Sequence, residues 1–292
     1  VRFRIQPPYN IMKIGIIGYG FVGKAIESGF KDEVEILKID PNLNNKISDL
    51  KNFHPSAIFI CVPTPMNEDN TQNISVLKKV LKELLELNLN TLVVIKSTVL
   101  PNYIDELGNL IPNFVYNPEF LREKHAEEDF ISSNLIVFGG KPNESESLGK
   151  IYKNYTKCLC KDYIYTDAIS ASFIKYTINS FLATKVSFFN ELKKLYESSG
   201  TQGSWDDLIY AISRDHRIGD SHMNVPGHDG RLGFGGACLP KDTNAFTLYA
   251  ELQGENLNVL KSAIKTNNKI RASYNSLTKR ESEQNIKYKG EN

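Results

Sequence analysis

The sequence lacks long hydrophobic runs, abundant cysteine and an excess of either charge. None of its apolar stretches approaches the roughly 20 residues that a membrane-spanning helix needs. Four cysteines in 292 residues are too few for a disulfide framework, and five histidines without paired spacing give no zinc motif. Lys and Arg number 35 against 34 Asp and Glu, for a net charge of +1. We therefore expect a cytoplasmic protein with no membrane, nucleic-acid or metal partner.

The N-terminal residues stand apart from the rest of the chain. Residues 1–11 contain two arginines but no apolar stretch of signal-peptide length, and the first regular pattern begins at Met12. We expect Met12 to be the native start and residues 1–11 to be a tag or a translated upstream stretch. The remaining length suggests about two domains at roughly 150 residues each.

From Met12 onward, short β-branched runs alternate with helical stretches. The expected strands are residues 13–17, 34–39, 57–62, 92–95, 113–116 and 135–138. Apolar strands separated by helices are typical of a parallel sheet that is covered on both faces. The pattern predicts an α/β fold, a Rossmann-type doubly wound parallel sheet, as a nucleotide-binding domain over residues 12–166.

The second half of the chain has a helical pattern. Residues 167–198 contain neither Pro nor Gly, which predicts one long central helix of roughly 48 Å. Its apolar residues occupy more than one stripe, so we expect a second copy of the chain to cover it in a homodimer. Shorter helices are expected at 205–212, 240–252 and 257–274. An all-helical domain then covers 167–274, followed by a polar, frayed tail at 275–292.

A glycine motif follows the first expected strand. Gly18, Gly20 and Gly23 have the spacing that permits a tight turn, close approach of a pyrophosphate, and packing of helix on strand. Asp40 ends the second strand and matches the acidic residue that binds a ribose. Because a carboxylate repels a 2′-phosphate, it favours NAD over NADP. The alternative is a sheet whose glycines serve packing alone.

Further polar segments follow the expected strands. They read CVPTP at 61–65, KSTV at 96–99 and NPEFLRE at 117–123, with GGACLPKD at 235–242 in a glycine-rich loop. The first three lie at the carboxyl edge of the sheet, where open α/β sheets bind ligands. Each alone is also compatible with an ordinary turn.

Two groups of side chains suggest chemistry. Cys238 precedes the expected helix that has Pro240 in its first turn, and Lys241 is near in sequence. A helix N-terminus and a cation both favour a nucleophilic thiolate, although a single cysteine can equally be inert, as Cys61 on its strand is expected to be. Lys175 and Asn179 share a helix face and could bind an oxyanion together, or form a polar surface edge.

Taken in order, these segments resemble the nucleotide-sugar 6-dehydrogenases, the UDP-glucose and GDP-mannose dehydrogenase group. The resemblance runs from Met12 to about Asn268. It implies NAD-dependent oxidation of a sugar C6 alcohol to a carboxylate, with Cys238 as the nucleophile that forms a thiohemiacetal and then a thioester. Lys175 and Asn179 would stabilise oxyanions, Thr98 and Asp242 would position a water, and Glu119 would be the base for hydrolysis.

The resemblance also implies two sets of binding residues. Contacts to NAD would come from Gly18, Gly20, Phe21, Val22, Gly23, Asp40, Val62, Pro63, Thr64, Ser97, Thr98 and Glu123. Contacts to the nucleotide sugar would come from Glu119, Phe120, Leu121, Lys175, Asn179, Arg217, Phe234 and Gly235. Arg217 would reach the substrate phosphates across a dimer.

The family normally continues into a second Rossmann-like domain that binds the nucleotide, and this sequence stops before it. We therefore expect a form that lacks the C-terminal nucleotide-binding domain, either a natural short form or an excised piece. The loop 226–236 is closer to the UDP-glucose branch, so UDP-glucose is the expected substrate. Two alternatives remain open: a dehydrogenase of the 6-phosphogluconate or 3-hydroxyacid type, and a non-catalytic NAD-binding partner that dimerises.

Overall fold

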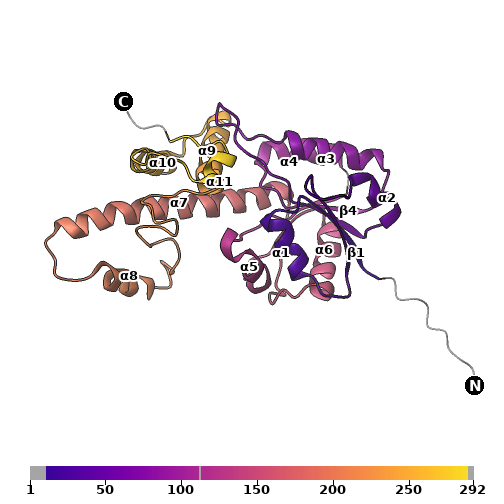
Figure 1. Cartoon of the computed structure of the whole chain (residues 1–292), viewed down its shortest axis with the longest axis horizontal. Helices are drawn as coiled ribbons and strands as arrows, with labels where there is room; N and C mark the ends of the chain where they lie inside the picture. The colour runs from indigo at the N-terminus through magenta and orange to yellow at the C-terminus, as the bar shows by residue number, and fades with distance from the viewer. Residues whose placement is uncertain (1–10, 112, 289–292) are drawn as a thin grey trace, which may run out of the picture. The chain divides into compact units, whose positions relative to one another are not determined.

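The computed structural model describes residues 11–111 and 113–288, and its chain forms two compact units (Figure 1). The first unit contains the residues up to Thr64 together with Ile74–Lys175. The second contains Pro65–Asn73 and the residues from Tyr176 onward. The boundary between the units therefore falls inside the long helix.

The first unit is built on a seven-stranded sheet with the order β2-β1-β3-β4-β5-β6-β7. The strands are β1 (Lys13–Ile17), β2 (Glu35–Ile39), β3 (Ala57–Ile60), β4 (Leu92–Ile95), β5 (Phe114–Tyr116), β6 (Val137–Gly140) and β7 (Ile164–Thr166). Strands β1 to β5 are parallel, whereas β6 is antiparallel to β5 and parallel to β7. The α/β fold class is confirmed, with one antiparallel junction near an edge, a common variation of doubly wound sheets.

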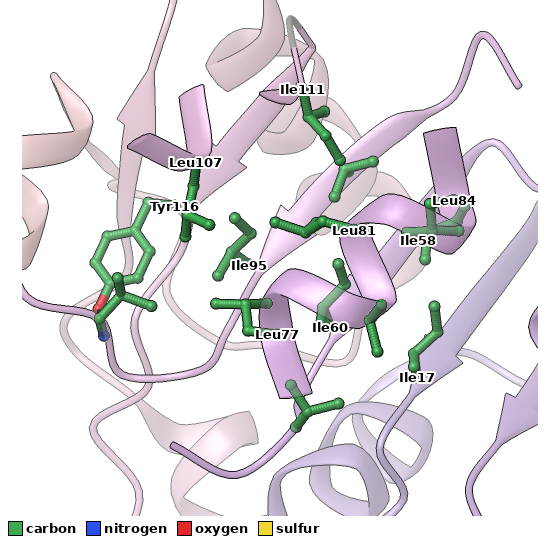
Figure 2. Close-up of a cluster of buried hydrophobic side chains, with 14 of the residues drawn as sticks. Ile17, Ile58, Ile60, Leu77, Leu81, Leu84, Ile95, Leu107, Ile111 and Tyr116 are labelled. Carbon is green, nitrogen blue, oxygen red and sulfur yellow. The ribbon is translucent and has the colours of Figure 1, made fainter. Parts of the chain in front are cut away.

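Helices cover both faces of this sheet. They are α1 (Phe21–Gly29), α2 (Leu50–Phe53), α3 (Ser75–Glu86), α4 (Pro101–Leu110), α5 (Ala126–Ser132) and α6 (Pro142–Tyr155), with the 3₁₀ turns η1 (Ile47–Asp49) and η2 (Glu123–His125). Alternate strand residues point to opposite faces. Ile58 and Ile60 join a core with helices α3 and α4 (Figure 2), while Ala57 and Phe59 join the core under α1, α5 and α6.

The second unit is helical, as the sequence predicts. The long helix α7 (Ala168–Ser198) begins one residue after the expected start, and its residues from Tyr176 onward belong to this unit. The other helices are α8 (Trp205–Ser213), α9 (Leu239–Leu252), α10 (Asn258–Arg271) and α11 (Lys279–Glu283). No helix among the described residues is both long and apolar enough to cross a membrane.

The prediction of a frayed tail after residue 274 is wrong for residues 275–288. Helix α11 begins with a capping box between Thr278 and Glu281, and the Glu281 side chain is fully buried. Ile286 is buried as well. The tail is ordered because its polar groups find buried partners from distant parts of the sequence, which composition alone does not show. Residues 1–10 and 289–292 lie outside the described residues.

Candidate active site

The glycine motif forms the turn between β1 and α1. Gly18 has a φ of +89°, and a Cβ there would lie 2.7 Å from the backbone carbonyl of Cys61, so this position requires glycine. Gly20 is the residue before α1, and a Cβ on it would meet no atom of the described residues within 4 Å. Phe21 and Val22 open the helix, so their N–H groups have no acceptor in the preceding turn. The open side at Gly20 beside a helix N-terminus fits a pyrophosphate.

Asp40 follows β2 and its carboxylate is fixed toward the glycine turn. The Tyr19 N–H donates to Asp40 Oδ2 at 2.9 Å, and the Asn42 N–H donates to Oδ1 at 3.0 Å. Asn42 Nδ2 also donates to Oδ1 at 3.0 Å. A carboxylate has about four acceptor positions, so these three bonds leave capacity on Oδ2 for a ribose hydroxyl. Because β1 and β3 are neighbours while β2 lies on the other side of β1, this edge is a topological switch point. The turn, the open glycine and Asp40 together fit an NAD molecule.

The segments after β3 and β4 are fastened to each other. The Ser97 hydroxyl is buried and donates to the Val62 carbonyl at 2.7 Å, and the Thr64 hydroxyl donates to the Thr98 carbonyl at 2.9 Å. Pro63 is exposed between them. The structure therefore brings four of the expected cofactor residues together at one sheet edge: Val62, Thr64, Ser97 and Thr98.

Glu119 and Lys175 form a buried ion pair in the first unit. Lys175 Nζ lies 3.1 Å from Glu119 Oε1 and also donates to the Glu119 carbonyl, while the Leu121 N–H donates to Oε2 at 2.6 Å. The ammonium lies 5.4 Å from the centre of the Phe120 ring. Both side chains are buried, so each charge is stabilised by the other. The structure thus brings together Glu119, Phe120, Leu121 and Lys175, as the sequence predicts.

A second buried cation lies beside this pair. Lys96, at the end of β4, donates to Asn117 Oδ1 at 3.0 Å, and the Tyr152 hydroxyl donates to the same oxygen at 2.6 Å. Burial lowers the pKa of Lys96 to about 8. Burial also raises the pKa of Cys61 to about 12, so this thiol stays protonated at neutral pH and fits the expected inert cysteine.

Cys238 is the residue immediately before α9, so its thiol is at a helix N-terminus as predicted. The Asp242 N–H, one turn further on, donates to the Cys238 carbonyl at 2.8 Å. Asp242 is fully buried, and its carboxylate accepts from Asn179 Nδ2 at 2.6 Å and pairs with Lys241. Asn179 and Asp242 therefore form a side-chain cluster in the second unit, and the backbone of Cys238 is bonded to the same turn of α9.

The other residues expected to bind the nucleotide sugar or NAD lie outside these two groups of side chains. Phe234 is buried, and its N–H donates to Asn267 Oδ1 at 2.6 Å, while Gly235 lies against Arg271 and Glu281. Arg217 belongs to neither cluster, because its exposed guanidinium is paired with Asp215 two residues earlier. Glu123 is exposed on η2.

Comparisons with known proteins show the family of the chain. Residues 49–156 match the NAD binding domain of the UDP-glucose/GDP-mannose dehydrogenase family, and residues 169–269 match its central domain. A UDP-glucose 6-dehydrogenase of Campylobacter jejuni is 30% identical over 291 residues, covering 88% of this chain and 72% of that protein. The chain belongs to the UDP-glucose/GDP-mannose dehydrogenase family.

Other members of the UDP-glucose/GDP-mannose dehydrogenase family match over a smaller share of their length. A UDP-glucose 6-dehydrogenase of Rickettsia felis is 37% identical over 246 residues, which are 80% of this chain and 51% of that protein. This chain thus spans about half of that relative. A UDP-glucose dehydrogenase structure from Pyrobaculum islandicum has a TM-score of 0.72 at 24% identity, covering 90% of this chain and 69% of the other, and it supports the fold.

Membership of this dehydrogenase family identifies the first unit as an NAD-binding domain, although the matched segment begins after Gly18–Gly23 and Asp40. The sequence did not indicate the roles of several buried polar residues near the expected ones. Asn267, Arg271 and Glu281 bond to residues 233–236, while Lys96, Asn117 and Tyr152 bond to one another. Lys96 and Asn117 are part of segments that the sequence singled out, so their position was a usable signal. The other four residues act through long-range contacts that no local motif reveals.

Proposed function

We propose that the chain carries out NAD-dependent oxidation of a nucleotide sugar at C6, with UDP-glucose as substrate and UDP-glucuronate as product. The observation that carries the proposal is the arrangement of Cys238, Asn179 and Asp242. Cys238 stands at a helix N-terminus, and its backbone carbonyl accepts from the N–H of Asp242, whose buried carboxylate holds the Asn179 amide. The names of the relatives support UDP-glucose.

In this proposal Cys238 is the nucleophile. Its thiolate adds to the C6 carbonyl carbon at the aldehyde stage, and the carbonyl oxygen becomes the oxyanion of a thiohemiacetal. NAD, when bound, accepts a hydride from C6 at each of the two oxidations. The second oxidation leaves a thioester, and water then replaces sulfur at C6, which releases the carboxylate and returns the thiol.

Asn179 and Lys175 are proposed to stabilise the oxyanions. An amide nitrogen carries two N–H groups, so Asn179 can donate one to Asp242 and one to an oxyanion. Asp242 then fixes the orientation of this donor, in addition to the expected role with Thr98 in positioning a water. A donor that is already oriented loses little free energy to reorganisation during the reaction.

Glu119 is proposed as the base that activates the hydrolytic water. Lys175 and the Leu121 N–H hold its two oxygens, but each oxygen has a second lone pair that can take a proton. When Glu119 takes that proton, the Lys175 ammonium loses the negative charge of its partner, which favours an oxyanion as the next partner. The pair thus links proton removal to oxyanion stabilisation.

The cofactor and subunit contacts are also part of the proposal. Gly18–Gly23 would bind the pyrophosphate, Asp40 the ribose, and Val62, Thr64, Ser97 and Thr98 the rest of NAD. The described residues contain exposed apolar side chains on α7, which support a homodimer through this helix. We propose that residues 12–166 are the NAD-binding domain and residues 167–274 the substrate and dimerisation domain.

The test is NADH production by the wild type and Cys238→Ser with NAD and a panel of nucleotide sugars. Two NADH per UDP-glucose, lost in the variant, would support the thioester route. One NADH per substrate, unaffected by the variant, would indicate a simpler dehydrogenase. NAD binding without any NADH formation would indicate a non-catalytic NAD-binding protein.

A further inference from the structure

The loop that carries Cys238 is held by side chains from distant helices. We define residues 233–238 as the cysteine loop. Asn190 Oδ1 on α7 accepts from the Gly233 N–H at 2.9 Å, and Asn267 on α10 bonds to both the N–H and the carbonyl of Phe234. Arg271 donates to the Gly233 carbonyl at 2.8 Å. These bonds fix the first half of the cysteine loop.

The second half of the cysteine loop is held by the C-terminal segment. We define residues 275–288 as the α11 segment. The Gly236 N–H, two residues before Cys238, donates to Glu281 Oε1 at 3.3 Å. A Cβ on Gly235 would lie 2.5 Å from Glu281 Oε1 and 2.6 Å from Arg271 Cζ. The loop backbone therefore lies directly against this carboxylate and guanidinium.

Glu281 is placed by several independent partners. Its Oε1 lies 3.6 Å from Arg271 Nη1 and accepts from the Tyr288 hydroxyl at 2.6 Å, and its Oε2 accepts from the Thr278 N–H at 2.7 Å. Arg271 also pairs with Asp229 at 2.7 Å. Burial of a carboxylate is costly unless it is paired and hydrogen-bonded. A fully buried Glu281 thus indicates a specific interaction with the loop and not a polar tail that rests on the surface.

The α11 segment is also fixed at its other end. Asn285 Nδ2 donates to the Met66 carbonyl at 3.0 Å, and Ile286 is buried. Met66 lies in the 65–73 segment of the same unit. Contacts at both ends keep Glu281 from moving away with its helix.

We propose that Glu281 is a positioning residue, which holds Gly235 and Gly236 so that Cys238 is kept at the N-terminus of α9. The proposal rests on the function proposed above, in which Cys238 is the nucleophile. The α11 segment is then part of the active-site architecture, although its sequence has no motif. Glu281 acts through the backbone of the loop and touches no reacting atom.

The experiment uses three variants of the full chain. Glu281→Gln keeps a carbonyl oxygen that can accept from Gly236, whereas Glu281→Met roughly keeps the volume and removes both oxygen acceptors. Glu283→Gln is the matched control, because Glu283 lies on the same helix and pairs with Arg280 at the surface. The readouts are hydrogen exchange of residues 232–237 and the rate of Cys238 alkylation by iodoacetamide, followed by peptide mass spectrometry.

We expect Glu281→Met to accelerate exchange of the cysteine loop by about tenfold or more, the effect of losing a hydrogen bond to a charged group. The rate of Cys238 alkylation in Glu281→Met should also differ from the wild-type rate. Glu281→Gln should recover part of the wild-type values, and Glu283→Gln should match the wild type. Equal loop exchange in the wild type and Glu281→Met would overturn the proposal. Acceleration spread evenly over all peptides would also overturn it, because that pattern reports a global loss of stability.

Neither readout requires turnover, so failure of the proposed function and failure of this inference are distinguishable. If the wild type forms NADH, Glu281→Met should lower kcat at least about tenfold with little change in KM for NAD, because the loop and not the cofactor site is disturbed. An unchanged kcat in a variant with a loosened loop would overturn the positioning role.

Discussion

At the scale of single residues, the buried charges of the first unit differ in how they are compensated. Lys175 is paired with the carboxylate of Glu119. The ammonium of Lys96 is bonded to a neutral amide oxygen, that of Asn117. A neutral acceptor compensates a buried ammonium less well than a carboxylate does. This difference agrees with the direction of the shift at Lys96, whose pKa burial lowers to about 8.

Lys96→Met should therefore stabilise the protein at pH 7 by about 1–2 kcal/mol, as replacement of poorly compensated buried charges often does. The pKa of Lys96 is lower in the folded than in the unfolded state, so folding releases a proton between these two values. The free-energy cost of burying the charge is fully present below pH 8. It decreases as the pH rises from 8 toward the pKa of Lys96 in the unfolded chain. The advantage of Lys96→Met should shrink from pH 7 to pH 10 in urea unfolding.

Comparison with Lys51→Met controls for loss of any lysine, because Lys51 is exposed. An advantage that is absent at pH 7, or that grows toward pH 10, would contradict the argument.

At the scale of elements, prediction from sequence succeeded where burial repeats along the chain. Strands β1, β3 and β4 were found because consecutive apolar residues bury against helices on both faces. Strand β7 was missed because its residues are three in number and mostly exposed at the edge of the sheet. Helix α11 is not predicted from the sequence, because its buried residue Glu281 is stabilised by contacts with Arg271 and Tyr288. Local hydrophobic periodicity gives no sign of these contacts.

The glycines at the start of α1 allow a paired test of two structural roles. A Cβ on Gly23 would overlap the Gly18 carbonyl oxygen, whereas a Cβ on Gly20 would meet no described atom within 4 Å. Gly23→Ala should therefore destabilise the fold by about 1–3 kcal/mol, as overpacking does. Gly20→Ala should leave stability within about 0.5 kcal/mol. It should weaken NADH binding about tenfold or more, because the backbone approaches the pyrophosphate there.

Thermal unfolding and NADH fluorescence titration measure the two effects separately. The opposite pattern, with a stable Gly23→Ala and normal NADH binding by Gly20→Ala, would mean that these glycines do not have the roles proposed for the dinucleotide turn.

At the scale of the whole molecule, the sequence predicts the fold class and the order of the α/β domain and the helical domain, because both depend on hydrophobic periodicity. The partners of the site residues were only partly predictable. The glycine turn and the start of α9 follow from local sequence. The pairing of Glu119 with Lys175 and of Asn179 with Asp242 joins residues more than fifty positions apart. The family resemblance assigned roles to these four residues, but neither it nor periodicity predicted that they pair.

Exposed apolar side chains on α7 are the physical reason for proposing a homodimer. Phe181, Phe188 and Leu195 on α7 are 66%, 57% and 66% exposed, although they are large and apolar. Their spacing is about two helical turns, so they lie along one face. Large exposed apolar side chains aligned along one helix face are typical of a protein interface. A second copy of the chain, presenting the same face, would bury it.

Phe188→Asp should therefore dissociate the dimer, because it would bury an unpaired carboxylate at the centre of this face. Light scattering after gel filtration should give twice 33.0 kDa for the wild type and 33.0 kDa for the variant. Leu252→Asp is the matched control, since Leu252 is 77% exposed at the end of α9 and lies off this face. A monomeric wild type, or a dimer that survives Phe188→Asp, would exclude α7 as the interface.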